Sequence, residues 1–396
     1  MSFSTSAVLE IFSLDFASGE EAPVLAGSLA VPERFNRLAW GTAPSDATRM
    51  PLGIIAGGLA DGSICLWNPS SIVDAGASKT PPLLAKMQKH GGPVKGLEFN
   101  SFSPNLLASG ASDGELCIWD VANPAQPSLY PALKSGAQGA PGAGPVEITY
   151  LAWNRKVQHI LASTQVDGAT VIWDLKKQRP VITLKDPNSQ RRCSVLQWNP
   201  EVATQLVVAS DDDRSPTLQL WDLRNSMGPV KEFVGHTKGV LGMAWCQHDP
   251  GLLLSCSKDC RTICWEVATT DVLCELPASG NWDFDVQWSP TLPGVFSTSS
   301  FDGKLAVHNL LACTGGGVVE TINADFSTTK VASGAAKPLK RAPAWMGKSS
   351  GVVFGFGGRL ASFSHYKQQV SDPATGQVGS GRLFWDCGCR QTARTL

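Results

Sequence analysis

The chain has 396 residues, which is enough for one large repeat array or for two ordinary domains. Its 33 Lys and Arg residues nearly balance its 34 Asp and Glu residues, so the net charge does not favour binding to nucleic acid or to an acidic membrane surface. No apolar run approaches the roughly 18 residues of a membrane span, and the start lacks the basic region of a signal peptide.

A strand pattern recurs along the chain, and each copy ends in an aromatic residue after alternating apolar positions. The first copy, residues 6–16, contains only the closing half of the pattern. The closing positions are Phe12, Trp67, Trp119, Trp173, Trp221, Trp265 and His308, which are 43 to 55 residues apart. The shorter spacings match the period of about 40–45 residues of WD repeats, and the longer ones indicate loop insertions.

The sixth copy, residues 235–277, is the most complete. It predicts four strands, at 240–245, 252–257, 262–267 and 272–276, between a Gly-His start and the closing Trp265. WD repeats generally join the His to a turn Asp, and a strand hydroxyl to the Trp indole. The expected partners here are His236 with Asp259, and Ser255 or Ser257 with Trp265.

Other copies share these spacings. In five of them an Asp stands six residues before the closing residue: Asp61, Asp113, Asp167, Asp259 and Asp302. We therefore expect a structural network within the blades rather than a ligand site. Its candidate members are His90, Asp113, Trp119, Asp167, Trp173, His236, Asp259 and Trp265.

The sequence thus predicts an all-β protein, a seven-bladed WD-repeat β-propeller over residues 1–312 with an incomplete first blade. In the seventh blade His308 replaces the closing Trp, which predicts an altered hydrogen-bond chain. Residues 313–344 are rich in Gly, Ala, Ser and Thr and predict a linker. Residues 345–363 predict a short β insert, and residues 364–396 show no usable period.

The insert is suited to binding a partner. Its central part, residues 352–360, is a β-prone run with a glycine hinge, able to add strands to an open sheet edge. The candidate partner-binding residues are Trp345, Val353, Phe354, Phe356 and Leu360. The alternative is that the insert packs on the propeller of its own chain.

Several longer strings are specific to one family. Residues 9–16, 34–41, 152–163, 173–180 and 192–240 resemble the large outer-shell subunit of the COPII vesicle coat, and the likeness extends over about residues 1–363. The resemblance implies a non-enzymatic scaffold in transport from the endoplasmic reticulum to the Golgi. It also implies that the insert completes the open propeller of a small coat subunit.

The same resemblance implies further partners and a location. Other copies of the chain would meet at cage vertices, and the inner coat would be contacted indirectly. The protein would be cytoplasmic and would reach the endoplasmic-reticulum and vesicle membranes only through the coat. No cofactor and no nucleic acid are expected.

The chain departs from the family at both ends. The family has further strands ahead of the first segment and helical and Pro-rich regions after the insert. We therefore expect a truncated member, with an open ring that exposes two sheet edges to association. Such a chain should not build cage edges or stimulate the coat GTPase.

Other readings of the sequence remain. Asp211–Asp213 has no His nearby and predicts a solvated turn, while Cys256, Cys260, Cys264, Cys387 and Cys389 lack the matched pairs of a zinc site and predict buried thiols. The basic loops Arg155-Lys156, Lys176–Arg179 and Arg191-Arg192 predict either a solvated rim or a shared rim that meets phosphates or acidic lipid. A generic peptide-binding adaptor, such as a ubiquitin-ligase substrate adaptor, would differ in having an apolar pocket at the axial opening.

Overall fold

The structure is a computed structural model. It describes residues 7–14, 23–42, 50–74, 81–131, 133–134, 146–186, 191–276, 280–314, 318–322, 328–332, 342–346, 350–354 and 360–364. The chain folds into two compact units, Met1–Lys340 and Arg341–Leu396.

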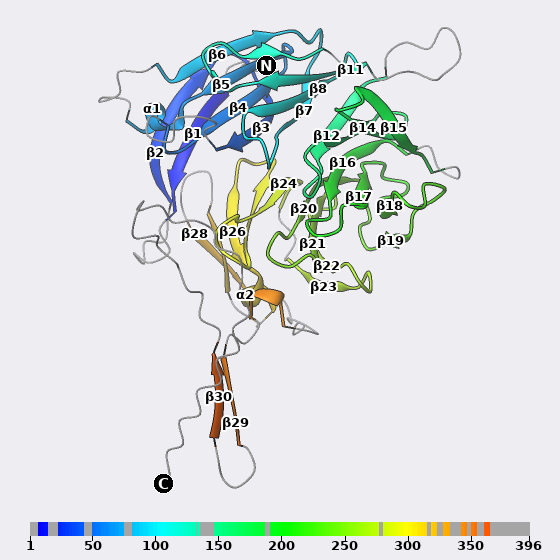
Figure 1. Cartoon of the computed structure of the whole chain (residues 1–396). Coiled ribbons are helices and arrows are strands. Elements are labelled where there is room, and N and C mark those ends of the chain that lie inside the picture. Colours follow the sequence, from blue (N-terminus) through cyan, green and yellow to red (C-terminus); the bar gives the residue numbers. More distant parts are fainter. Residues whose placement is uncertain are drawn as a thin grey trace. The chain divides into compact units, whose positions relative to one another are not determined.

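The first unit consists of antiparallel sheets that follow one another around a common centre in chain order (Figure 1). The sheet nearest the N-terminus has two strands, β1 (Ala7–Ser13) and β2 (Val24–Val31), and the short helix α1 (Pro69–Val73) lies against it. The second sheet contains β3 (Phe35–Gly41), β4 (Ile54–Leu59), β5 (Ser63–Trp67) and β6 (Leu83–Gln88). The third contains β7 (Val94–Phe99), β8 (Leu106–Ala111), β9 (Glu115–Asp120), β10 (Ser128–Leu129) and β11 (Leu133–Lys134).

The remaining sheets of this unit repeat the same order. The fourth has β12 (Ile148–Trp153), β13 (Ile160–Gln165), β14 (Thr170–Asp174) and β15 (Arg179–Leu184). The fifth has β16 (Cys193–Trp198), β17 (Gln205–Ser210), β18 (Leu218–Asp222) and β19 (Lys231–Phe233). The sixth has β20 (Val240–Trp245), β21 (Leu252–Ser257), β22 (Thr262–Glu266) and β23 (Val272–Glu275). The seventh has β24 (Asp283–Trp288), β25 (Val295–Ser300), β26 (Leu305–Asn309), β27 (Val318–Ile322) and β28 (Thr328–Ala332), with helix α2 (Leu310–Thr314) after β26.

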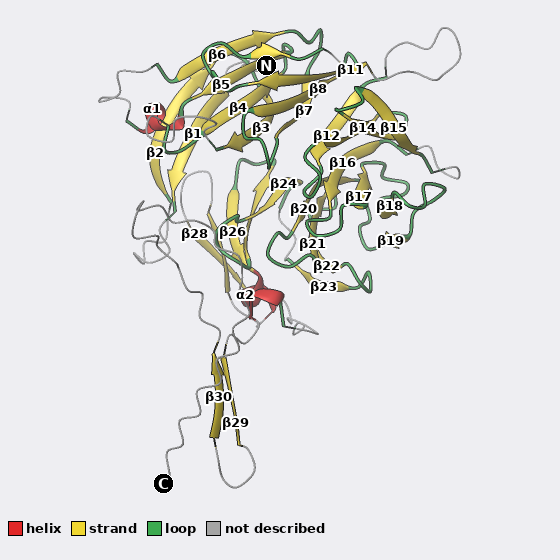
Figure 2. Ribbon diagram, viewed as in Figure 1, coloured by secondary structure: helices red, strands yellow, loops and turns green. Residues whose placement is uncertain are grey.

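This is the predicted all-β WD-repeat propeller, and strands dominate it (Figure 2). A single four-stranded blade cannot bury both of its faces, so each blade needs neighbours. The first strand of each blade packs on the first strand of the next, from β3 through β7, β12, β16 and β20 to β24. Buried side chains of adjacent blades form shared cores, and Trp153 and Trp265 are fully buried there.

The predicted incomplete first blade has two strands. Leu9 and Ile11 of β1 are buried with Trp67 of the second blade and Ile72 of α1. Within the described residues, β3 and β24 do not pack on each other as the other inner neighbours do. Apolar side chains remain exposed on both sides, with Trp40 of β3 57% and Phe301 of the seventh blade 68% exposed.

The seventh blade corrects the expected linker over residues 313–344. β27 pairs with β26, and β28 pairs with β27, so both strands extend the seventh sheet. β27, whose sequence is rich in β-branched residues, pairs with the outer edge of β26 at Leu305 and Ala306. The sequence pattern did not predict β27 and β28, because the closing residue of this blade is a His and the sequence that follows it is rich in Gly.

The second unit contains the predicted insert. The 3₁₀ turn η1 (Ala344–Met346) holds the half-buried Trp345, and β29 (Ser350–Phe354) pairs with β30 (Leu360–Ser364) in an antiparallel hairpin. Val353 and Phe354 lie on β29, and Leu360 begins β30. Phe356 and the tail 365–396, including Cys387 and Cys389, lie outside the described residues. No helix in the described part of the chain is both long enough and apolar enough to span a bilayer.

Candidate functional site

The sixth blade contains a continuous hydrogen-bond chain. Nδ1 of His236 lies 3.1 Å from Oδ2 of Asp259, and Nε2 of His236 lies 2.7 Å from Oγ of Ser255. Nε1 of Trp265 donates to the same Ser255 hydroxyl at 2.8 Å. Of the two hydroxyls that the sequence left open, Ser255 therefore joins the chain.

Asp259 is the branching point of this chain. It also accepts from the backbone N–H of Thr237 at 2.9 Å and from that of Arg261 at 3.1 Å. Burial alone would raise the pKa of Asp259, but the hydrogen bonds from His236 and Thr237 outweigh burial and lower the pKa to about 2. The carboxylate therefore stays ionised and ties the start of the blade to its turn.

A close approach explains the Gly of the Gly-His start. A Cβ atom at Gly235 would lie 2.7 Å from a ring carbon of Trp265. Any larger side chain would therefore displace the indole from the chain described above.

The third blade repeats most of the chain. Nε2 of His90 lies 2.8 Å from Oγ of Ser109, and Trp119 donates to that hydroxyl at 2.9 Å. Nδ1 of His90 and Oδ2 of Asp113 lie 3.4 Å apart, and Asp113 accepts from the N–H of Gly91 at 2.7 Å. The link between the imidazole and the carboxylate is therefore longer here than in the sixth blade.

The fourth blade keeps only part of the chain. Trp173 donates to Ser163 at 2.9 Å, and Asp167 accepts from the N–H of Ala169 at 3.1 Å. The side chain of Asp167 is 41% exposed and pairs with Lys185 at 3.1 Å. The same motif position is thus a buried hub in the sixth blade and a surface ion pair in the fourth.

The sequence analysis offered Ser255 or Ser257 for the sixth blade, but it missed the corresponding hydroxyls of the other blades. Ser109, Ser163, Ser255 and Thr298 each stand ten residues before a closing aromatic residue and contact its ring nitrogen. That fixed offset was a usable signal. The offset holds even in the seventh blade, where the closing residue is a His: Nε2 of His308 lies 3.1 Å from Oγ1 of Thr298. Replacing Trp by His alters the donor and keeps the link.

His308 should make stability depend on pH. Burial lowers the pKa of His308 to about 4, and its ring stacks on Phe296 with centroids 5.2 Å apart. The unfolded chain then binds the proton more readily, so this residue reduces stability as pH falls from about 6.5 to about 4. On acidification through this range, we expect the free energy of unfolding of His308→Phe to fall by roughly 3 kcal/mol less than that of the unmodified chain. Urea unfolding of both proteins at pH 7 and pH 4.5 measures it, and equal losses in the two proteins would contradict the assignment.

The turn after the motif Asp shows a second pattern. Gly62, Gly114, Gly168 and Gly303 follow Asp61, Asp113, Asp167 and Asp302, and all four have positive φ. In the sixth blade Cys260 takes this position with φ 63°. An L-residue meets a steric penalty there that Gly avoids, so Cys260 is held by the surrounding turn.

The acidic cluster Asp211–Asp213 and the cysteines of the sixth blade make contacts within the propeller. Asp213 accepts from the N–H of Gly239 at 2.9 Å, which joins the fifth blade to the start of the sixth, and Asp211 lies 3.4 Å from Arg192 at the start of its own blade. Cys264 and Cys274 face each other across β22 and β23, and the hydrogen bond with the Cys274 thiol, together with burial, raises the pKa of Cys264 well above its usual value. Within the described residues, no group of three or more His, Cys, Asp or Glu side chains is arranged to hold a metal ion.

Charged and aromatic groups meet on the inner strands. Glu98 of β7 accepts from the N–H of Trp153 at 2.6 Å and from Arg155 at 2.7 Å. Burial raises the pKa of Glu98, and Arg155 opposes that rise. The guanidinium of Arg37 lies 4.5 Å from the ring centre of Tyr150. These contacts join the inner strands of the second, third and fourth blades, and they differ from the apolar axial pocket expected of a peptide adaptor.

One cavity lies between the fourth and fifth blades. It has a volume of about 20 Å³ and is lined in part by Thr170, Arg191, Cys193 and Gln219. This volume holds about one water molecule. It is therefore too small for a peptide side chain or a cofactor.

The three basic loops do not share one rim. Arg155-Lys156 follow β12 and Lys176–Arg179 follow β14, and the N–H of Leu175 donates to the carbonyl of His159 at 2.9 Å. Arg191-Arg192 precede β16, at the opposite ends of the strands. Because neighbouring strands in a blade are antiparallel, loops that follow the first and third strands lie on one side, and the loop between blades lies on the other.

Comparisons with known proteins agree with this fold. The family model described as "WD domain, G-beta repeat" matches residues 82–120 and 227–266. The chain is 53% identical over 362 residues to protein transport protein SEC31 homolog B of Arabidopsis thaliana, which covers 91% of this chain and 31% of that protein. It is 36% identical over 403 residues to human Sec31A, covering 96% of this chain and 32% of that protein. The chain thus spans about a third of the length of the curated relatives it matches.

A solved structure matches over most of both chains. A chain from a structure described as "COPII on membranes, outer coat vertex" superimposes with a TM-score of 0.68 and 31% identity, covering 91% of this chain and 88% of that one. The repeated blades, the long matches to Sec31 proteins and this superposition agree, and the chain belongs to the Sec31 family of COPII outer-coat proteins.

Proposed function

We propose that this chain is a non-enzymatic scaffold of the outer COPII layer in transport from the endoplasmic reticulum to the Golgi. In this role it lies on the cytosolic side of the coated membrane and meets other copies of itself at cage vertices. The blade network of His90, Asp113, Trp119, Asp167, Trp173, His236, Asp259 and Trp265 keeps the propeller rigid. The hairpin β29–β30 binds the small open-propeller subunit of the outer coat.

The hairpin is the observation that carries the proposal. β29 and β30 pair only with each other among the described strands. An isolated two-stranded hairpin is at best marginally stable in water, and its outer edges carry free backbone donors and acceptors. A partner sheet with an open edge would satisfy those groups by strand addition.

Deleting residues 345–363 tests this assignment. We expect the chain of residues 1–363 to capture the purified small coat propeller, and the chain without residues 345–363 to lose that capture. Replacing the same residues by a Gly-Ser segment of equal length controls for spacing. Equal capture by the intact and shortened chains would contradict the hairpin assignment, and an unchanged melting temperature of the propeller unit would verify that the deletion is local.

A further inference from the structure

One side of the propeller unit carries a rigid set of turns. It is formed by the loops 100–105, 154–159 and 199–204, which follow the inner strands of the third, fourth and fifth blades. Nδ2 of Asn100 donates to the carbonyl of Gln158 at 2.9 Å, and Nδ2 of Asn154 donates to the carbonyl of Ala203 at 2.8 Å. The loops of three blades are therefore fixed side by side. We call this surface, with the turns that follow β14, β18 and β22, the turn face.

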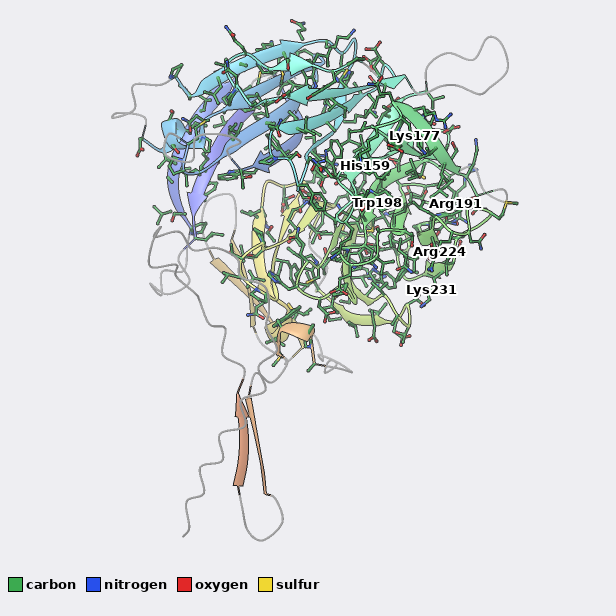
Figure 3. The ribbon with its side chains drawn as sticks, in the orientation of Figure 1. His159, Lys177, Arg191, Trp198, Arg224 and Lys231 are labelled. Carbon is green, nitrogen blue, oxygen red and sulfur yellow. The ribbon has the colours of Figure 1, made fainter. Side chains whose placement is uncertain are left out.

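Positive charge on the turn face is concentrated in the fourth blade. Its two turns contain Arg155, Lys156, Lys176, Lys177 and Arg179 but one carboxylate, Asp174. The corresponding turns of the sixth blade, residues 246–251 and 267–271, contain no Lys or Arg and two Asp residues. Figure 3 labels Lys177 and His159 in this part of the ribbon. The excess of positive charge therefore distinguishes the turns of the fourth blade from those of the sixth.

Three of these cations are exposed and available. Lys156, Lys176 and Arg179 are exposed, and none of them forms an ion pair with another described residue. Lys177 lies 3.8 Å from Asp174 and is 58% exposed, which is a weak contact. Solvent-facing cations on adjoining turns repel one another, so an anionic group that contacts several of them is favoured.

Apolar side chains border the cations. Phe102 is 49% exposed in the loop that Asn100 joins to the fourth blade, and Val202 is 39% exposed in the loop that Asn154 joins to it. We propose that the turn face of the fourth blade docks an acidic peptide segment of a protein partner, with carboxylates on Lys156, Lys176 and Arg179 and an apolar residue on Phe102. Complementary charge sets the position of such a segment, and the apolar contact adds affinity.

The distribution of charge favours a peptide over an anionic membrane. A membrane is a plane and would cover the turn face of several blades together. Glu201 of the fifth blade and Asp271 of the sixth are exposed on that face, and a negative lipid surface would repel both. A segment of about ten residues covers one blade and avoids them.

The test is fluorescence anisotropy of the full chain with a labelled twelve-residue peptide of Glu and Asp that carries one Leu and one Phe. We expect Lys176→Glu/Arg179→Glu to weaken binding at least about tenfold, because attraction becomes repulsion at the docking position. The matched control is Arg214→Glu/Lys238→Glu, which makes the same change in charge at two exposed residues at the opposite ends of the strands. We expect that pair to change binding less than about twofold, since salt screens distant charges.

Three outcomes would overturn the proposal. They are no binding of the peptide by the unmodified chain, equal weakening by the two charge reversals, and sedimentation with phosphatidylserine vesicles that depends on Lys176 and Arg179 while the peptide does not bind. Thermal unfolding of each variant verifies folding. Because all four substituted side chains are exposed, their melting temperatures should match that of the unmodified chain.

Discussion

Replacing Trp265 with Ala is expected to lower the free energy of unfolding by roughly 3–5 kcal/mol, the range for a large-to-small change in a packed core. The indole is fully buried and makes an edge contact with Phe233, with ring centroids 5.7 Å apart. Its loss also leaves the Ser255 hydroxyl without the donor at 2.8 Å. Urea unfolding followed by far-UV circular dichroism measures the change.

The chain provides a matched control in Trp40. That residue is 57% exposed on β3, so Trp40→Ala removes a side chain of the same size that buries less than half of its surface, together with the hydrogen bond from its indole N–H to the carbonyl of Leu52 at 2.6 Å. We expect it to cost roughly 1–2 kcal/mol, clearly less than Trp265→Ala. If the two substitutions cost the same, Trp265 does not occupy the core of a blade.

Replacing Asp259 with Ala is expected to lower the free energy of unfolding by roughly 3 kcal/mol, because it leaves the buried ring nitrogen of His236 and two backbone N–H groups without this acceptor. The N–H groups of Thr237 and Arg261 lose bonds of 2.9 and 3.1 Å, and His236 loses its contact at 3.1 Å. Asp259→Asn should recover part of the loss, since an amide oxygen can still accept one of these hydrogen bonds.

Asp167 is the control at the same motif position of the fourth blade. Its side chain is 41% exposed, against 4% for Asp259. Asp167→Ala should therefore cost less than about 1 kcal/mol, as expected for an exposed ion pair. A larger loss at Asp167 than at Asp259 would show that burial does not determine how much the motif Asp contributes to the free energy of unfolding.

The sequence was a good guide to the blades because their signal is periodic. Closing aromatics such as Trp119 and Trp173 recur at regular spacing, and the alternating strands before them could form only sheets that stack on one another. The same logic failed after His308, where no closing Trp followed and strands β27 and β28 were assigned to a linker. Their pairing depends on the free edge of β26, which is a property of the folded sheet.

The contribution of each motif Asp to stability, and the side of the propeller on which each basic loop lies, were harder to predict. Asp167 and Asp259 share one offset from their closing Trp, yet burial makes one a surface pair and the other a hub. The basic loops at Lys176 and Arg191 are close in sequence, but they lie at opposite ends of the strands. Both differences arise from tertiary structure, which a local pattern does not encode.

The most direct test of the scaffold account is amide hydrogen exchange of the full chain with and without the small open-propeller subunit. If the hairpin adds strands to the open sheet of that partner, the N–H groups of Ser350–Phe354 and Leu360–Ser364 become protected, and those of the buried strand β21 exchange as before. Unchanged exchange in the hairpin, with protection confined to the propeller blades, would contradict the account.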